Sequence, residues 1–213
     1  MASTILEETE RIGPEAAGAL LSTAEFDALT ADDFEDGYRY ELIRGVLIVT
    51  PIPSEAEADP HEILGHLLRE YQEQHPQGKT LDKTLPERYV YTPDSRRRAD
   101  RVIWTGLGRL PDPRRDVPSI VVEFVSRGRR NRDRDYSEKR LEYAAAGVRK
   151  YWIIDRFRRT MTISSVGNEG SAKELMERVV SEEEFYESPL LPGFSLPLAR
   201  LLAVADAWKQ GRS

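Results

Sequence analysis

Two carboxylates, Asp100 and Glu123, carry the clearest sign of chemistry in this sequence. Glu123 stands inside the apolar run 119–125, where an ionised carboxylate is costly unless it is paired or bound to a metal. Asp100 stands at the start of a second expected strand, 101–104. If the two segments are neighbouring strands, the carboxylates converge at one sheet edge within about 6 Å, and such hard oxygen ligands suit Mg²⁺ or Mn²⁺. We therefore expect a divalent metal site there.

Lys139 would supply a cation beside these acids. It falls in a predicted helix, residues 133–146, on the side shared with Tyr136 and Tyr143. Its ammonium group can therefore reach back to the sheet edge that carries Glu123. A set of Asp, Glu and Lys can hold a metal and orient a water. A purely structural ion pair between Glu123 and Lys139, or between Glu123 and an arginine, explains the same residues without catalysis.

Positive charge is concentrated in the middle of a chain whose net charge is −6. The segment from Arg96 to Arg159 holds 19 Lys or Arg against 9 Asp or Glu, a net of +10, and the remainder carries −16. A metal held by acids beside a phosphate held by arginines is typical of phosphodiester chemistry. The alternative is that the densest stretch, 127–134, is a solvated loop. The candidate phosphate contacts in it are Arg127, Arg129, Arg130 and Arg132.

Other common sites find little support in the sequence. The chain has no cysteine, which excludes disulfides, thiolate nucleophiles and Cys-ligated metal centres. Residues 78–80, Gly-Lys-Thr, lack the preceding glycine of a phosphate-binding loop, because Glu73 stands there. His61 and His66 almost form a zinc-protease helix, but residues five apart lie about 140° apart around a helix. No Gly-x-Ser-x-Gly motif of a serine hydrolase is present.

The elements that must position these residues alternate between helices and strands. The apolar spacing predicts one α/β domain, with helices on both faces of a mixed sheet. We expect an extension over residues 1–20 and a single domain over 21–213, with residues 188–197 wrapping the surface. The expected helices are 22–30, a helix of about 15 residues opened by Pro60, 133–146 and 198–208. The expected strands are a hairpin over 38–51 with its turn at Arg44-Gly45, followed by 80–91, 101–104, 119–125, 150–155, 160–166 and 175–180.

Composition limits where such a protein works. With 39% hydrophobic and 32% charged residues, the 213-residue chain is typical of a folded globular protein. No apolar run approaches the ~18 residues of a membrane span. The acidic start of the chain lacks the basic and apolar segments of a signal peptide, which predicts a cytoplasmic protein.

Several segments together resemble the Uma-two family of proposed restriction endonucleases, part of the PD-(D/E)XK nuclease superfamily. The resemblance runs from about Leu21 to Leu202 and implies a restriction-endonuclease-like fold, a central mixed β-sheet flanked by helices with an N-terminal hairpin. The most specific part is 143–155 together with 189–194. The other matching segments are 39–45 (RYELIRG), 98–102 (RADRV), 122–126 (VEFVS) and 135–139 (DYSEK).

The resemblance implies roles for individual residues. Asp100 matches the acid of the PD element and Glu123 the acid of the second element, both metal ligands. Ala99 replaces the proline, which shapes the backbone and binds no metal. Val125 stands where the lysine of the E-x-K element would be, so the resemblance suggests Lys139 as its substitute.

Two further residues enter through the same resemblance. Glu41 matches an acidic position in the family's hairpin and would complete the metal shell. His61 matches the start of the next helix and is a secondary candidate, because a lone histidine at a helix start is more often a surface or capping residue.

Two functions stay open at this point. The leading hypothesis is a Mg²⁺- or Mn²⁺-dependent endonuclease that cleaves DNA, with Lys139 orienting the attacking water. A homodimer would fit a duplex substrate. The alternative is a catalytically silent module that binds nucleic acid or a protein. Intact Asp100 and Glu123 favour the enzyme, and the missing lysine at position 125 favours the alternative.

Overall fold

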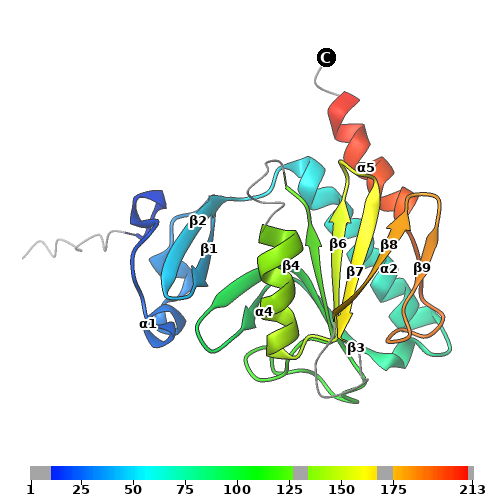
Figure 1. Cartoon of the computed structure of the whole chain (residues 1–213), viewed down its shortest axis with the longest axis horizontal. Coiled ribbons are helices and arrows are strands. Elements are labelled where there is room, and N and C mark those ends of the chain that lie inside the picture. Colours follow the sequence, from blue (N-terminus) through cyan, green and yellow to red (C-terminus); the bar gives the residue numbers. More distant parts are fainter. Residues whose placement is uncertain (1–10, 127–133, 167–174, 211–213) are drawn as a thin grey trace, which may run out of the picture. The chain divides into compact units, whose positions relative to one another are not determined.

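The computed structural model describes residues 11–126, 134–166 and 175–210 and divides into two compact units (Figure 1). The first unit is Met1–Ile52 with Thr92–Arg98, and the second is Pro53–Tyr91 with Ala99–Ser213. Strand β4 (Arg96–Thr105) begins in the first unit and continues in the second.

The first unit is built around the predicted hairpin. Its turn residues, Arg44 and Gly45, have φ of 50° and 79°. Two successive positive φ values are typical of a type I′ turn, whose twist matches that of the two strands. The elements of this unit are the 3₁₀ turns η1 (Pro14–Ala16) and η2 (Ala31–Asp33), helix α1 (Thr23–Ala28), and strands β1 (Tyr38–Ile43) and β2 (Val46–Pro51).

Local contacts hold the elements of the first unit together. The predicted capping box at the start of α1 is confirmed, because Ser22 and Glu25 each accept a hydrogen bond from the other's backbone N–H. Strand β1 pairs with the start of β4, where Leu42 lies opposite Arg96. Backbone hydrogen bonds also join residues 11–21 to the hairpin.

The second unit contains a mixed sheet with helices on both faces, as predicted. Strands β4, β5, β6, β7 and β8 are hydrogen-bonded in that order, and β3 pairs with β4. The β5–β6 pair is parallel, whereas β4–β5, β6–β7 and β7–β8 are antiparallel. The strands are β3 (Leu81–Tyr91), β5 (Ile120–Phe124), β6 (Lys150–Asp155), β7 (Thr160–Val166) and β8 (Leu175–Ser181).

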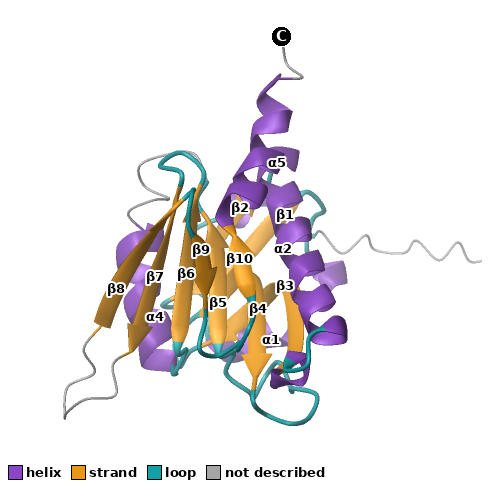
Figure 2. Ribbon diagram, turned by 90° about the vertical axis from the view of Figure 1, so that its right-hand side faces the viewer, coloured by secondary structure: helices purple, strands orange, loops and turns teal. Residues whose placement is uncertain are grey.

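Figure 2 shows α2 and α5 on one face of this sheet and α4 on the other. Helix α4 is preceded by a π-helical turn, where the sequence predicts one continuous α-helix, and it ends at Gly147 with a φ of 97°. The remaining elements are α2 (Glu55–Gln74), the turns η3 (Gly78–Thr80) and η4 (Arg134–Glu138), α4 (Lys139–Ala146), α5 (Leu198–Gln210), and the small hairpin of β9 (Phe185–Glu187) and β10 (Ser195–Pro197).

Helix α2 begins earlier than the sequence predicts. Pro60 lies inside the helix, and the start is set by a capping box between Ser54 and Glu57. A proline has no N–H for the carbonyl of the residue four positions before it, here Ala56. Arg156 donates to that carbonyl instead, at 2.8 Å. The prediction that Pro60 opens the helix is therefore wrong, because a side chain from the turn after β6 replaces the missing donor.

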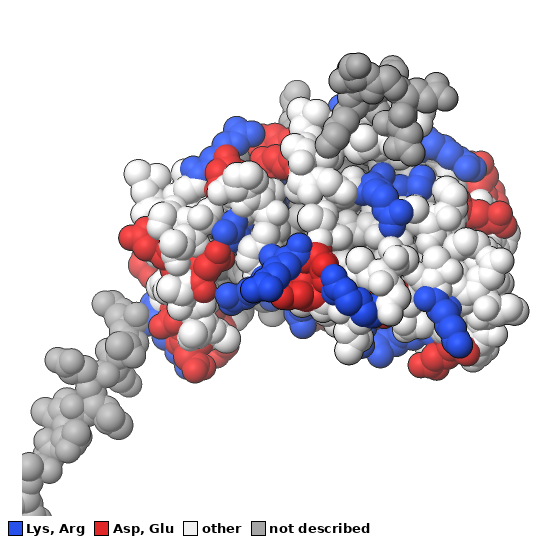
Figure 3. Space-filling model, turned by 90° about the horizontal axis from the view of Figure 1, so that it is seen from below, with Lys and Arg blue, Asp and Glu red and all other residues white. Residues whose placement is uncertain are grey.

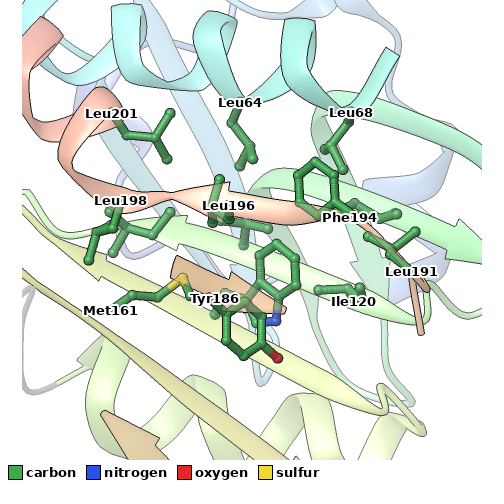
Figure 4. Close-up of a cluster of buried hydrophobic side chains, with 14 of the residues drawn as sticks. Leu64, Leu68, Ile120, Met161, Tyr186, Leu191, Phe194, Leu196, Leu198 and Leu201 are labelled. Carbon is green, nitrogen blue, oxygen red and sulfur yellow. The ribbon is translucent and has the colours of Figure 1, made fainter. Parts of the chain in front are cut away.

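Both faces of the sheet are buried against apolar side chains. Residues on β5 alternate between them: Val122 packs towards α2 and α5, and Val121 packs towards α4. The larger cluster also contains apolar residues of the segment 188–197. The prediction that this segment wraps the surface is therefore wrong for its apolar side chains. Figure 4 shows these side chains, Leu191, Phe194 and Leu196, within the cluster, and each is at most 4% exposed.

Within the described part of the chain, no helix is long and apolar enough to cross a membrane.

Candidate active site

Asp100 and Glu123 lie on neighbouring strands, β4 and β5, which run antiparallel. Arg101 of β4 lies opposite Val122 of β5, so the register carries Asp100 to the level of Glu123. The Asp100 Oδ2 atom accepts a hydrogen bond from the Phe124 N–H at 2.7 Å. Asp100 and Glu123 are 4% and 3% exposed. The sheet therefore brings two buried acids together, and their sharing of one metal ion stays a prediction.

Lys139 reaches Glu123 from helix α4. Its Nζ lies 2.8 Å from the Glu123 Oε1, and the Tyr143 hydroxyl donates to the same oxygen at 2.9 Å. Lys139 and Tyr143 are four residues apart and share one face of the helix. The predicted placement of the Lys139 ammonium beside Glu123 is confirmed.

Val125 occupies the strand position at which the family motif has its lysine, and Lys139 on α4 provides a cation on the same face of the sheet. Residues two apart on a strand point to the same face, so a side chain at position 125 shares the α4 face with Glu123. Val125 is buried there in the apolar cluster that also contains Tyr143. Lys139 thus brings an ammonium group to the sheet face on which a lysine at position 125 would stand.

His61 meets Asp100 from the opposite helix layer. Its Nε2 lies 3.6 Å from the Asp100 Oδ2, and its ring stacks on Phe124 with centroids 4.2 Å apart. His61 is 5% exposed, so it is not the surface residue that its position at a helix start suggests. By contrast, His66 on the same helix is exposed and faces Glu70. The two carboxylates of the site therefore contact different helices, Asp100 meeting α2 and Glu123 meeting α4.

Glu87 joins this group although the sequence does not single it out. His61, Glu87 and Asp100 each offer one ligand atom, and these atoms all lie within 4.8 Å of one another. Glu87 has a φ of 52°, which is unusual for a residue other than glycine. It stands in a polar stretch of β3 with no periodic pattern, so only the pairing of β3 with β4 brings it to Asp100.

Glu41 lies in the first unit, on β1. Its carboxylate is buried and accepts a hydrogen bond from the Arg98 N–H at 2.9 Å. Its part in the metal shell stays a prediction.

The predicted phosphate contacts, Arg127, Arg129, Arg130 and Arg132, lie outside the described residues. Figure 3 shows one face of the molecule, on which Lys and Arg side chains alternate with Asp and Glu. Basic side chains on this face therefore do not form one continuous positive patch.

The mixed sheet, its two helix layers and the acids on adjacent strands define a restriction-endonuclease-like α/β protein. A solved structure from Anabaena variabilis, "a putative nuclease belonging to DUF820", has the same fold, with a TM-score of 0.65 and 14% sequence identity. The similarity covers 87% of this chain and 99% of that one. The Uma2 family model, described as "Putative restriction endonuclease", matches residues 23–199, and the chain belongs to this family. No curated protein matches the chain.

Proposed function

We propose that this protein is a metal-dependent endonuclease that hydrolyses DNA phosphodiester bonds. The observation that carries the proposal is the contact between Lys139 Nζ and Glu123 Oε1, at 2.8 Å, on the strand next to Asp100. Phosphodiester hydrolysis by a metal-dependent nuclease needs ligands for the metal and a positive group that orients water and stabilises developing negative charge. An acid pair with an adjacent cation supplies both. Family membership and the nuclease-like fold support the same function.

The donor set fits a divalent ion. Asp100 and Glu123 are the proposed ligands, and His61 and Glu87 offer further donor atoms beside Asp100. Carboxylates suit Mg²⁺ and Mn²⁺, and an imidazole favours Mn²⁺ over Mg²⁺. When bound, the ion would polarise the scissile phosphate and make a water more acidic.

The side chains of this protein have separate tasks in the proposal. Lys139 orients the attacking water and stabilises negative charge as it develops on the phosphate. Tyr143 holds the Glu123 carboxylate by its hydrogen bond to Oε1. Glu41 adds a carboxylate to the metal shell. Arginines of the 127–134 segment bind the DNA backbone, and a homodimer places one site on each strand of a duplex.

One observation favours a second candidate, a catalytically silent binding module. The Glu123 Oε1 atom already receives hydrogen bonds from both Lys139 and Tyr143, so the acid has internal compensation without a metal. Such a module would keep the fold and its contacts with nucleic acid or a protein, and would lack hydrolysis.

A plasmid-nicking assay with Mg²⁺ or Mn²⁺ separates the two candidates. The test variant is Asp100→Asn, because an amide oxygen still accepts the Phe124 N–H while the ligand charge is lost. The matched control is Glu73→Gln, an exposed acid on α2. We expect metal-dependent cleavage by the wild type and the control, and none by Asp100→Asn. Equal cleavage by all three proteins, or none by the wild type, would overturn the proposal. Linear product from a single encounter, rather than nicked circles, would support the dimer.

A further inference from the structure

Arg101, the residue after Asp100, is a buried arginine beneath helix α2. It is 3% exposed, and burial lowers the pKa of its guanidinium group. One Nη atom donates to the His61 backbone carbonyl at 2.8 Å, and the other donates to the Thr84 hydroxyl at 3.3 Å. Both acceptors are neutral, so no carboxylate offsets the buried charge in these two contacts. Their effect is to hold a turn of α2 and strand β3 against Arg101.

Gly65 makes this approach possible. A Cβ atom at position 65 would come within 2.5 Å of an Arg101 Nη atom and 2.9 Å of its Cζ. Gly65 lies one helical turn after His61, so the guanidinium lies directly under the turn that carries the imidazole. A glycine inside a helix lowers helix stability, and here the absence of a Cβ atom permits the close contact with Arg101.

Asp100 and Arg101 then act on the same histidine from adjacent positions of one strand. Asp100 faces the His61 ring, and Arg101 binds the His61 backbone. We propose that Arg101 is a positioning residue that fixes the His61 turn of α2 to strand β4 and so sets the imidazole beside the Asp100 carboxylate. The proposal rests on the metal site described above. The observation that carries it is the close approach of the Arg101 guanidinium to Gly65.

Two variants perturb this contact in different ways. Arg101→Met removes both hydrogen bonds. Gly65→Ala is compatible with folding, because alanine favours helix and the clashing atoms are the far end of a flexible side chain. It displaces the guanidinium while leaving Arg101 in the chain. The matched control is Arg69→Met, an exposed arginine on the same helix.

The first measurement is the ¹H NMR spectrum of the metal-free protein. The chain has three histidines, so the imidazole signals can be assigned with single His→Gln variants. Stacking on Phe124 gives the His61 ring protons a ring-current shift. We expect this shift to move towards the value of the exposed His66 in Arg101→Met and in Gly65→Ala, and to stay unchanged in Arg69→Met. An unchanged His61 shift in both test variants would overturn the proposal.

The second measurement is Mn²⁺ affinity by calorimetry. We expect about a 10- to 100-fold loss in both test variants, the range found when groups that orient metal ligands are removed. Wild-type affinity in a variant whose His61 has moved would overturn the link to the metal. Absence of Mn²⁺ binding in the wild type would instead count against the proposed function, and the NMR shift would still decide the role of Arg101.

Discussion

The Lys139 ammonium lies 2.8 Å from the Glu123 Oε1, and each side chain is only 4% exposed. Removing one partner of a buried ion pair leaves the other charge uncompensated, which costs about 3–5 kcal/mol. We expect Lys139→Met and Glu123→Gln each to lower the free energy of unfolding by roughly this amount, and the double variant to lose clearly less than the sum. Urea denaturation of the four proteins measures the coupling. Additive effects would mean that the two residues do not interact.

Tyr143 tests the orientation of the same carboxylate with a smaller change. Tyr143→Phe removes one hydrogen bond to Glu123 and keeps the ring in the core, so we expect a loss of about 1.5–3 kcal/mol in unfolding free energy. Cleavage, measured as kcat/KM, should fall about tenfold. Tyr136→Phe is the control, since its hydroxyl bonds Asp155 instead. The assigned role fails if both variants reduce cleavage equally.

Glu41→Gln tests the hairpin carboxylate. The amide oxygen can still accept the Arg98 N–H, so the variant should fold normally while the charge is lost. We expect reduced cleavage that higher Mg²⁺ concentrations partly restore, with Asp32→Asn, an exposed acid of the same unit, as control. Full cleavage activity in Glu41→Gln would remove this residue from the site.

A chain of net charge −6 must bind DNA through local positive charge. Binding should weaken steeply with salt, because each phosphate contact adds about 0.9 to the log–log slope. Changing Arg129, Arg130 and Arg132 to Ser should weaken binding and flatten that slope for any sequence. Ca²⁺ should strengthen wild-type binding, since the site acids otherwise repel phosphate. Titrations of a short duplex at several salt concentrations measure these effects.

The control for this variant is a second triple change, Arg69, Arg88 and Arg200 to Ser, which removes the same charge from exposed positions elsewhere. If both triple variants bind equally, only net charge matters. If the wild type shows no salt-dependent binding, the polyanion hypothesis is wrong.

An ion pair between Arg109 and Asp116, in the loop after β4, should make the stability of the protein depend on pH in the acid range. The Arg109 guanidinium, followed by the Asp112 N–H, lowers the pKa of Asp116 from 3.8 to about 2. A carboxyl with a lowered folded-state pKa stabilises the protein above the unfolded value and loses that effect as pH falls from about 4 to 2. The Tm difference between wild type and Asp116→Asn should therefore shrink across this window. A constant difference measured by calorimetry would show that the ion pair does not contribute.

Several features followed from the sequence alone because they depend on neighbours along the chain. The Arg44-Gly45 turn, the cap at Ser22 and the buried strand around Glu123 are set by local backbone preference and apolar periodicity. Helical spacing also placed Lys139 and Tyr143 on one side of their helix, and both contact Glu123.

Other features required the tertiary structure. Helix α2 continues through Pro60, and Arg156, far away in sequence, donates to the Ala56 carbonyl that the proline leaves without its helical donor. Residues 188–197 have turn-forming composition, yet their apolar side chains fill the core between the sheet and α2 and α5. Neither contact leaves a periodic signal, since each depends on one long-range approach.

The candidate site divides in the same way. Glu123 stands out in the sequence because a charge in an apolar strand needs compensation, and Asp100 and Lys139 stand out because the expected strands and helix place them near it. His61 and Glu87 carry no such mark, and they meet Asp100 only because α2 and β3 both pack against β4. Sequence determined which acids must be compensated, and the packing of elements distant in sequence decided which side chains surround them.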